Sequence, residues 1–335
     1  MQITVLGAGI SGVTTALRLQ SALPKASINI TAEHFNSDTL SAGAAGIFRP
    51  GSGLRGGAGQ NVGDWIKSSY NYYSSILASR DASVAGIMRV DGYLFSSGEE
   101  SVVRNPLLEN LLPIYRMATE DEITEICPDS NFKHGAYFQT MVIESEKFLP
   151  WGIQKFLQAG GTMTQKKINS FQEVNNNNLI INCTGLGARK LCQDNRVVPI
   201  RGQVFKVRAP WIKMFYYGDY DTYIIPTSTQ VTLGGTRNFD SWNTNSDEFD
   251  EASILARCSK LIPNLKNAEI IRSWVGLRPY RDQVRVEFDD KLWSEKGIQV
   301  IHNYGHGGYG ITASGTSEEV VKLVLEKMRM NKSKL

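Results

Sequence analysis

The 335-residue sequence is poor in the residues that most often build metal sites and disulfide frameworks. It contains four histidines and four cysteines, the latter at Cys127, Cys183, Cys192 and Cys258. No Cys-x-x-Cys pair and no zinc-ligand spacing occurs. We therefore expect no metal centre, and we interpret the cysteines as reduced thiols in a non-secretory compartment.

Long apolar runs and a strong charge imbalance are also absent. No stretch approaches the roughly 20 apolar residues that a membrane span requires. The net charge is only +3, and no basic run occurs outside the C-terminal tail. The first expected strand begins at Met1, which leaves no room for a leader peptide. We expect a globular protein that binds neither nucleic acid nor a membrane.

The last three residues carry a localisation signal. Ser333-Lys334-Leu335 at a free C-terminus is a receptor-recognised address for the peroxisome. The sequence therefore predicts the peroxisomal matrix as the location and the peroxisomal import receptor as a partner. The alternative is that Lys327–Leu335 is only a solvated basic tail.

The N-terminal stretch has the pattern of a strand, a glycine turn and a helix. Ile3, Val5 and Leu6 suit a short buried strand, and apolar residues recur at helical spacing over Val13–Leu19. Between them lies the glycine turn Gly7-Ala8-Gly9-Ile10-Ser11-Gly12. Such glycines permit a tight turn, the approach of a pyrophosphate and close packing of the helix on the strand. This pattern predicts a dinucleotide site; the alternative is a glycine-rich helix start that binds nothing.

A carboxylate in the right place completes this pattern. A second apolar run, Ile28–Ala32, ends at Glu33, 21 residues after Gly12. A carboxylate there can accept hydrogen bonds from a ribose diol and disfavours a 2′-phosphate.

Two later glycine turns follow apolar strands. Leu179–Asn182 leads into Cys183-Thr184-Gly185, and Gly297–His302 leads into the turn Asn303–Gly310 and a helix over Ser317–Met328. The turn at Gly185 either closes the cofactor site or is a structural strand end. Sequence-distant turns of this kind favour an α/β cofactor domain assembled from both chain ends and a middle segment.

Other local patterns predict further elements. We expect a strand pair with a turn at Asp91-Gly92, a helix beginning at Pro150, an edge strand over Lys166–Val174, an asparagine turn at Asn175–Asn178 and an aromatic, acidic loop over Trp211–Asp221.

Eight motifs resemble those of the D-amino acid oxidase and D-aspartate oxidase family of flavoproteins, in family order. They are Gly7-Ala8-Gly9-Ile10-Ser11-Gly12, Ala44-Ala45-Gly46, Leu149-Pro150-Trp151, Asn182-Cys183-Thr184-Gly185, Arg201-Gly202-Gln203, Leu233-Gly234-Gly235, Gly276-Leu277-Arg278-Pro279 and His302-Asn303-Tyr304-Gly305-His306-Gly307-Gly308. The resemblance implies FAD, a doubly wound Rossmann-like FAD domain and an α+β substrate domain on a mixed sheet. From the positions of the glycine turns we assign residues 1–56, 146–196 and 288–335 to the first and 57–145 and 197–287 to the second.

The resemblance also implies the cofactor contacts. Besides the first glycine turn and Glu33, they are Ala44, Ala45, Gly46, Arg49, Ile168, Thr184, Gly185, Gly307, Gly308, Gly310, Ile311 and Thr312.

In this family the substrate α-hydrogen leaves as hydride to flavin N5, the imino acid hydrolyses to an oxo acid and ammonia, and oxygen reoxidises the flavin to give hydrogen peroxide. Arg278 matches the family arginine that binds the α-carboxylate, and Tyr223 matches the tyrosine that assists it. Gly308 matches the residue whose carbonyl receives the substrate amine. A planar guanidinium suits bidentate carboxylate binding, which an ammonium does not.

Arg237 bears on substrate choice. It follows Gly234-Gly235 as in D-aspartate oxidases, where D-amino acid oxidases are typically apolar. A neutral substrate is expected to leave Arg237 buried and unpaired, at a cost of roughly 3–5 kcal/mol. The loop Phe215–Asp221 lacks an arginine found in mammalian relatives, and Arg49 is a candidate to supply that charge. The alternative places Arg237 on the surface, facing Asp240.

We therefore expect a peroxisomal FAD-dependent oxidase of acidic D-amino acids, with oxygen as the second substrate. The main alternative is a D-amino acid oxidase of broad specificity that acts on neutral substrates. A flavin-binding protein without turnover, an NAD-linked dehydrogenase and a homodimeric assembly also stay open.

Overall fold

The computed structural model describes residues 1–51, 53–128, 130–174 and 179–332. The predicted turn at 175–178 and the tripeptide at 333–335 lie outside these residues. In the described ranges, no helix combines the length and apolar character needed to cross a membrane. Nor do these ranges bring together three or more His, Cys, Asp or Glu side chains that could hold a metal ion.

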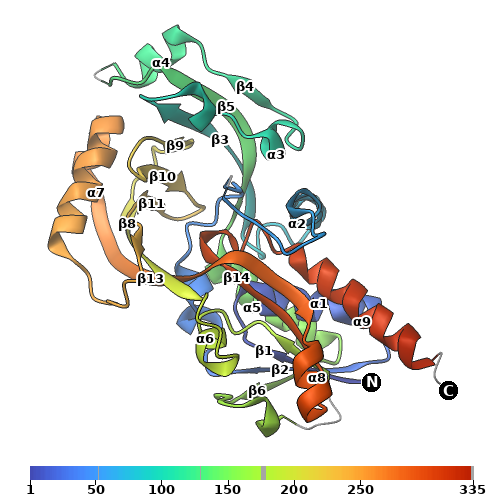
Figure 1. The fold of residues 1–335 in the computed structure, drawn as a ribbon. Coiled ribbons are helices and arrows are strands. Elements are labelled where there is room, and N and C mark those ends of the chain that lie inside the picture. Colours follow the sequence, from blue (N-terminus) through green and yellow to red (C-terminus); the bar gives the residue numbers. More distant parts are fainter. Residues whose placement is uncertain (52, 129, 175–178, 333–335) are drawn as a thin grey trace.

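The helices are distributed along the whole chain (Figure 1). Their bounds are α1 (Ile10–Ala22), α2 (Val62–Leu77), α3 (Pro106–Glu109), α4 (Glu120–Ile126), α5 (Ser145–Gln158), α6 (Gly187–Leu191), α7 (Glu248–Leu261), α8 (Asp290–Lys296) and α9 (Thr316–Lys332).

The strands within the described ranges form one continuous mixed sheet. They are β1 (Gln2–Leu6), β2 (Ser27–Ala32), β3 (Ile87–Ser96), β4 (Tyr115–Met117), β5 (His134–Ile143), β6 (Thr162–Gln165), β7 (Leu179–Asn182), β8 (Val198–Arg208), β9 (Phe215–Tyr217), β10 (Tyr223–Pro226), β11 (Val231–Gly234), β12 (Asn238–Phe239), β13 (Glu269–Phe288) and β14 (Val300–His306). The order is β4-β5-β3-β9-β10-β11-β8-β13-β14-β7-β1-β2-β6, with β12 beside β8.

One half of the sheet is parallel, in the order β14-β7-β1-β2-β6. Its central strands are apolar on both faces, as a covered parallel sheet requires. Helix α1 contacts both α5 and α9, and these helices cover this half (Figure 1). The carboxyl ends of β1, β2 and β7 therefore meet at one edge, where a ligand site is expected.

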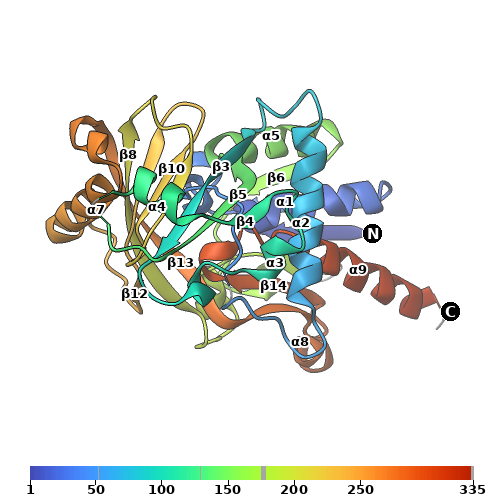
Figure 2. The ribbon, with the colours of Figure 1, turned by 90° about the horizontal axis from the view of Figure 1, so that it is seen from above.

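The other half is largely antiparallel and carries α7 on its outer side (Figures 1 and 2). The long strand β13 joins the halves: Glu269–Tyr280 pairs with β8, and the stretch up to Phe288 pairs with β14. The α/β class and the mixed sheet agree with the prediction. The exact domain boundaries stay a prediction, because the sheet itself runs through both halves.

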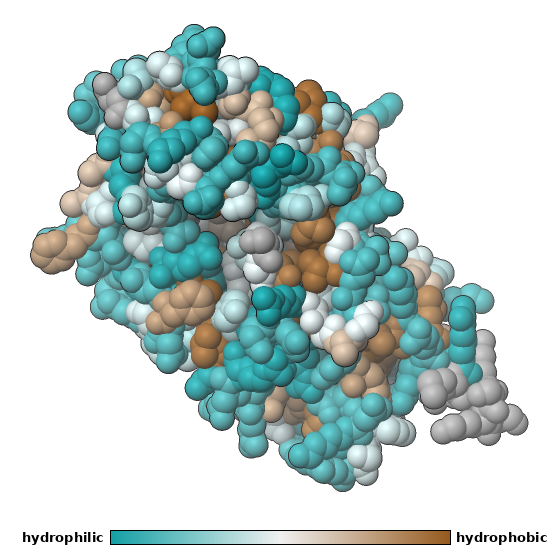
Figure 3. All heavy atoms as spheres, turned by 45° about the horizontal axis from the view of Figure 1, so that its top comes forward, coloured by the Kyte–Doolittle hydropathy of each residue, from teal (hydrophilic) through white to brown (hydrophobic). Residues whose placement is uncertain are grey.

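Hydrophilic side chains cover most of the face shown in Figure 3, and apolar ones form small separate groups. All four cysteines are unpaired. Burial raises the pKa of Cys127, Cys183 and Cys258 to about 12 and that of Cys192 to about 11, so these thiols stay protonated near neutral pH.

The turn predicted at Asp91-Gly92 is wrong. Both residues lie inside the uninterrupted strand β3, which pairs with β5 along its whole length. Glycine is needed there because a Cβ at Gly92 would lie 2.0 Å from the carbonyl oxygen of Phe215 on β9. The residue that signalled a turn instead allows a close approach of two strands.

Helix α5 begins at Ser145, five residues before the predicted start at Pro150. Phe148 and Leu149 are fully buried, and the first turn is held by Lys147 and Phe148 N–H groups that donate to the carbonyl of Glu144. Core packing therefore outweighs the usual preference for proline in the first turn.

Three further boundaries differ from prediction. The edge strand is β6, Thr162–Gln165, and Lys166–Val174 leaves the sheet. Strand β14 starts at Val300 and continues to His306, so the last glycine turn is shorter than expected. The loop over Trp211–Asp221 contains strand β9, which pairs with β3 and β10.

Candidate active site

A cavity of about 1580 Å³ lies where the two halves of the sheet meet. It extends from Glu33 at the end of β2 to Tyr223 on β10 and Arg278 on β13. Every site residue predicted from the sequence lines this cavity except Gly12. The structure thus brings the predicted cofactor and substrate residues to one continuous space.

Gly12 acts through packing instead. A Cβ there would lie 1.9 Å from the carbonyl oxygen of Gly7, so only glycine lets α1 start this close to the turn after β1. Gly7 itself has φ +99°, and a Cβ on it would lie 2.5 Å from the carbonyl oxygen of Cys183 on the neighbouring segment.

The N-terminus of α1 opens onto the cavity. Its cap, Gly9, provides no side chain, and the first turn carries no acidic residue. The N–H of Ile10 donates to Ser41 Oγ at 3.0 Å, and Ile10 and Ser11 both line the cavity. The positive end of a helix with no competing carboxylate suits the pyrophosphate of a dinucleotide such as FAD.

Glu33 marks the far end of the cavity. Its carboxylate lies 3.0 Å from Lys167 Nζ and 3.7 Å from His34 Nε2, and it is 43% exposed. Lys167 and Ile168 line the same end, because the chain leaves the sheet after β6 and bends over the cavity. Glu33 is thus accessible to a ribose diol, in competition with Lys167.

Thr184 and Gly185, at the end of β7, are held by a polar network. Asn182 Oδ1 accepts from the Thr184 hydroxyl at 2.7 Å, and Asn182 Nδ2 lies 3.1 Å from His302 Nδ1. His302 Nε2 lies 2.9 Å from Asp289, and this contact holds the pKa of Asp289 well below its usual range. Asn182 is the first residue of the motif Asn182-Cys183-Thr184-Gly185, but the sequence analysis did not predict this supporting role.

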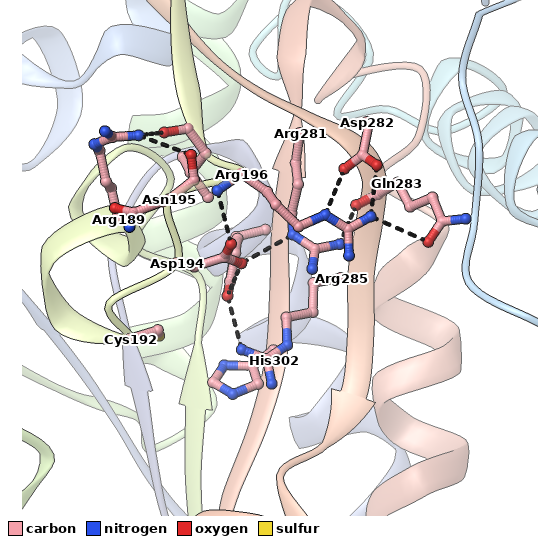
Figure 4. A network of polar contacts seen from close by, with 12 residues as sticks. Arg189, Cys192, Asp194, Asn195, Arg196, Arg281, Asp282, Gln283, Arg285 and His302 are labelled. Atoms are coloured by element: carbon pink, nitrogen blue, oxygen red, sulfur yellow. Dashed lines mark hydrogen bonds and ion pairs between the residues drawn. The ribbon is translucent and has the colours of Figure 1, made fainter.

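The network continues from His302 to Asp194, Arg281 and Arg285 (Figure 4). Asp194 accepts from Arg281 Nε at 2.9 Å and from the Tyr304 hydroxyl at 2.8 Å. Arg285 donates to the Tyr304 hydroxyl at 3.0 Å and lies 3.3 Å from Asp289. These contacts tie the segment after α6 to β13 and β14.

Ala44, Ala45 and Gly46 form a flat wall of the cavity. Gly46 has φ +85°, and a Cβ there would lie 2.4 Å from the carbonyl oxygen of Ile143. Arg49 follows, with its guanidinium carbon 4.4 Å from the centre of the Tyr217 ring.

The last glycine turn forms the opposite wall, through Gly307, Gly308, Gly310, Ile311 and Thr312. Gly308 lies against the stem of Arg278: a Cβ there would be 3.3 Å from Arg278 Cδ. His306, directly before the turn, is buried and lies 3.1 Å from Thr316 Oγ1.

Arg278 and Tyr223 are neighbours at the end of the cavity. Arg278 Nη1 donates to the Thr236 carbonyl at 3.0 Å. Burial raises the pKa of Tyr223, an effect that Arg278 partly offsets, so the hydroxyl stays a donor. Two donors side by side are the arrangement expected for a bound carboxylate.

Two glycines make room for this pair, and sequence reasoning gave neither of them this role. A Cβ at Gly202 on β8 would lie 2.2 Å from Arg278 Nη2, so the guanidinium lies flat over bare backbone. A Cβ at Gly234 would lie 2.1 Å from the Tyr223 ring. The signal was present in the motifs Arg201-Gly202-Gln203 and Leu233-Gly234-Gly235.

Arg237 lines the cavity but is neither unpaired nor fully buried. Its Nη2 donates to Asp221 Oδ1 at 3.0 Å, and its side chain is 48% exposed. The expectation that a neutral substrate would leave Arg237 buried and unpaired is therefore wrong. The surface alternative agrees with this exposure, but the partner is Asp221 rather than Asp240.

Tyr217 was also missed as a site residue. It lines the cavity, its ring centre lies 5.6 Å from that of Tyr223, and the two residues pair across β9 and β10. The run Phe215-Tyr216-Tyr217 has high strand propensity, which could have identified β9.

Comparison with known proteins identifies the family of this chain. The model of the family described as FAD dependent oxidoreductase matches residues 2–323. The chain is 34% identical to the D-aspartate oxidase of Homo sapiens over 329 residues, covering 97% of this chain and 95% of the relative. It is 34% identical to a D-amino acid oxidase of Dugesia ryukyuensis over 333 residues, covering 97% of each.

Solved structures show the same fold. The glycine oxidase of Bacillus cereus superposes with a TM-score of 0.80 at 18% identity, covering 97% of this chain and 95% of that one. The chain therefore belongs to the FAD dependent oxidoreductase family, alongside D-aspartate and D-amino acid oxidases, which confirms the predicted family, enzyme class and FAD cofactor.

Proposed function

We propose that this protein oxidatively deaminates D-amino acids with FAD and oxygen, and that it prefers acidic ones. The observation that carries the proposal is the pair Arg278 and Tyr223, two donors side by side at the end of a cavity that begins at a dinucleotide-type glycine turn. The names of the relatives, a D-aspartate oxidase and a D-amino acid oxidase, support the same substrate class.

Each residue has a limited task in this chemistry. The flavin, when bound, supplies the acceptor for the substrate's α-hydrogen and electron pair, and reacts with oxygen. Arg278 and Tyr223 hold the α-carboxylate, and the carbonyl of Gly308, beside the Arg278 stem, accepts from the substrate amine. Together they fix the orientation of the Cα–H bond, which is the main service that the protein provides.

The acidic preference is supported by the balance of charge at this end of the cavity. Arg49, Arg237 and Arg278 line it, against the carboxylates of Asp219 and Asp221. Asp221 is bound to Arg237, and Asp219 accepts from the Ser97 hydroxyl at 2.5 Å. An excess of guanidinium groups favours a substrate with a second carboxylate.

Peroxide release with D-aspartate, D-glutamate, D-asparagine and D-alanine tests the proposal. We expect higher kcat/KM values for the two acidic substrates. Faster turnover of D-alanine would favour the broad-specificity alternative, which the existing Arg237–Asp221 pair already makes plausible. A yellow protein that none of these substrates bleaches anaerobically would instead indicate flavin binding without turnover.

The proposal extends to location in the peroxisomal matrix, through recognition of Ser333-Lys334-Leu335 by the import receptor. Fluorescent fusions with the tripeptide left at the free C-terminus, and with it deleted, test this. Punctate peroxisomal signal that the deletion does not abolish would contradict it.

A further inference from the structure

The arginines that line the cavity differ in what balances their charge. Within the described part of the chain these are Arg49, Arg104, Arg237 and Arg278. Arg104 pairs with Glu109 at 2.7 Å, and Arg237 pairs with Asp221 at 3.0 Å. For Arg49 and Arg278 no carboxylate of the described residues lies within ion-pair distance. Two guanidinium groups are thus left for an anion from outside the chain.

An ordered segment presents Arg49 to the cavity. The chain from Gly46 to Pro50 runs beside β5, where the N–H of Phe48 donates to the Met141 carbonyl at 2.8 Å and the Thr140 hydroxyl donates to the Phe48 carbonyl at 2.7 Å. Phe48 is fully buried on one side of this segment, and Arg49 lines the cavity on the other. The alternation follows from extended backbone, in which successive side chains point to opposite sides.

The position of Arg49 relative to Arg278 is set by two tyrosines. The Arg49 guanidinium carbon lies 4.4 Å from the centre of the Tyr217 ring, within the range of a cation–π contact. The centre of the Tyr217 ring is 5.6 Å from that of Tyr223, which in turn interacts with Arg278. The two guanidinium groups without a carboxylate partner therefore lie next to one tyrosine pair, Arg49 at Tyr217 and Arg278 at Tyr223.

We propose that Arg49 binds the side-chain carboxylate of an acidic D-amino acid while Arg278 binds its α-carboxylate. This rests on the proposed function and deepens it, since it names the residue that selects the substrate class. The sequence offered Arg49 both as a flavin contact and as a source of the charge missing from the loop Phe215–Asp221, and the proposal assigns it the second role at a stated carboxylate. Arg237 is expected to contribute less to binding the second carboxylate, because its guanidinium already pairs with Asp221 and its side chain is half exposed.

The decisive variant is Arg49→Gln, tested on D-aspartate and on D-asparagine, which has nearly the same shape but no second charge. Loss of a charge-assisted contact should lower kcat/KM for D-aspartate roughly 10- to 100-fold and change that for D-asparagine less than about threefold. Arg49→Lys keeps the charge but not the bidentate geometry, so it should show a smaller loss for D-aspartate alone. It also carries the test if Arg49→Gln fails to fold.

Arg104→Gln is the matched control. It removes the same charge from the same cavity, but from a guanidinium already paired with Glu109, and its selectivity should equal that of the unmodified protein. An equal loss of selectivity in Arg104→Gln would indicate a general effect of charge and would overturn the assignment to Arg49.

Binding without turnover gives a second readout. Titrating the flavin absorbance with succinate and with its monoamide, succinamate, measures affinity for a dianion and for a monoanion of nearly the same shape. Arg49→Gln should weaken succinate binding at least about tenfold and leave succinamate and FAD affinity within about threefold. Equal weakening of both ligands, or loss of FAD, would overturn the proposal in favour of a structural or cofactor role.

The unmodified protein separates the two proposals. If it oxidises D-asparagine as well as D-aspartate, the acidic preference fails. If it prefers D-aspartate and Arg49→Gln keeps that preference, the proposed function stands and the role of Arg49 is overturned.

Discussion

The two ends of the cavity are built in different ways. At the dinucleotide end, one contiguous turn between β1 and α1 supplies backbone, and Gly7 and Gly12 are required because a Cβ on either would strike a neighbouring carbonyl oxygen. At the substrate end, charged and aromatic side chains arrive from β9, β10, β13 and the segment after Gly46. The first end is local in sequence, whereas the second exists only after strands far apart in the chain have paired.

This difference predicts different sensitivities to mutation. A site built from backbone groups should lose FAD binding altogether when its shape changes, since no single group provides the binding. A set of charged side chains can lose one member and keep the rest, so its mutations should alter selectivity. The following variants test this contrast.

Gly12→Ala should have the largest effect. Its Cβ would lie 1.9 Å from the Gly7 carbonyl oxygen, so α1 must move away from the phosphate-binding turn. We expect a protein without bound FAD, as measured by its visible spectrum and by FAD titration. Gly53→Ala is the control, because nothing lies within 4 Å of a Cβ there and Gly53 also lines the cavity. Normal FAD content in Gly12→Ala would contradict the backbone account.

Arg278→Gln should lower kcat/KM for every D-amino acid while leaving FAD bound. Losing one partner of a buried, hydrogen-bonded charge pair costs about 2–5 kcal/mol, which corresponds to roughly 30- to 5,000-fold. The loss should be similar for D-aspartate and D-asparagine, because both carry the α-carboxylate. Arg272→Gln, an exposed arginine on the same strand, serves as the control. A loss confined to one substrate would argue against α-carboxylate binding.

Gly202→Ala should reproduce part of this loss without touching a charge. The added Cβ would lie 2.2 Å from Arg278 Nη2 and would displace the guanidinium from β8. We expect roughly a 10- to 100-fold fall in kcat/KM for all substrates, with an unchanged circular dichroism spectrum. Full activity would show that the guanidinium need not lie against β8.

His306 is buried directly before the last glycine turn, and we expect it to make the stability of the protein depend on pH. Burial lowers its pKa to about 4, so the unfolded chain binds the proton first. The contribution of neutral His306 to the free energy of unfolding is complete above about pH 6.5 and is lost as the pH falls toward 4. At pH 5 the free energy of unfolding should therefore be lower by about 2 kcal/mol. Urea unfolding at pH 7 and pH 5 measures this. His306→Asn should flatten the dependence, and His34→Asn, at an exposed position, should not.

Arg237→Gln should have the smallest effect. Its guanidinium is half exposed and paired with Asp221, and such pairs contribute about 0.2–1 kcal/mol. We expect selectivity for D-aspartate over D-asparagine to change less than about fivefold. A loss as large as that expected for Arg49→Gln would make Arg237 the second carboxylate site, as the sequence first suggested.

Much of the fold and of the dinucleotide end could be predicted from residues that are close together in the chain. The strand at Ile3–Leu6, the glycine turn and Glu33 form a single local pattern whose geometry follows from steric rules. Predictions from local sequence failed where contacts with residues far apart in the chain determine the structure. Gly92 resembles a turn residue until β9 lies against it, and Pro150 resembles a helix start until Phe148 and Leu149 enter the core.

At the substrate end the sequence named Arg278, Tyr223, Gly308 and Arg237 only through resemblance, and the structure decided how they are used. Which arginine meets Asp221, and which is left beside Tyr217 without a carboxylate, depends on pairing across β9 and β10 and on the path after Gly46. The sequence by itself determined a dinucleotide-binding α/β chain, because steric limits on backbone act between near neighbours. Only the tertiary structure decided the charge balance of the cavity, because electrostatic pairing depends on distances between residues far apart in the chain.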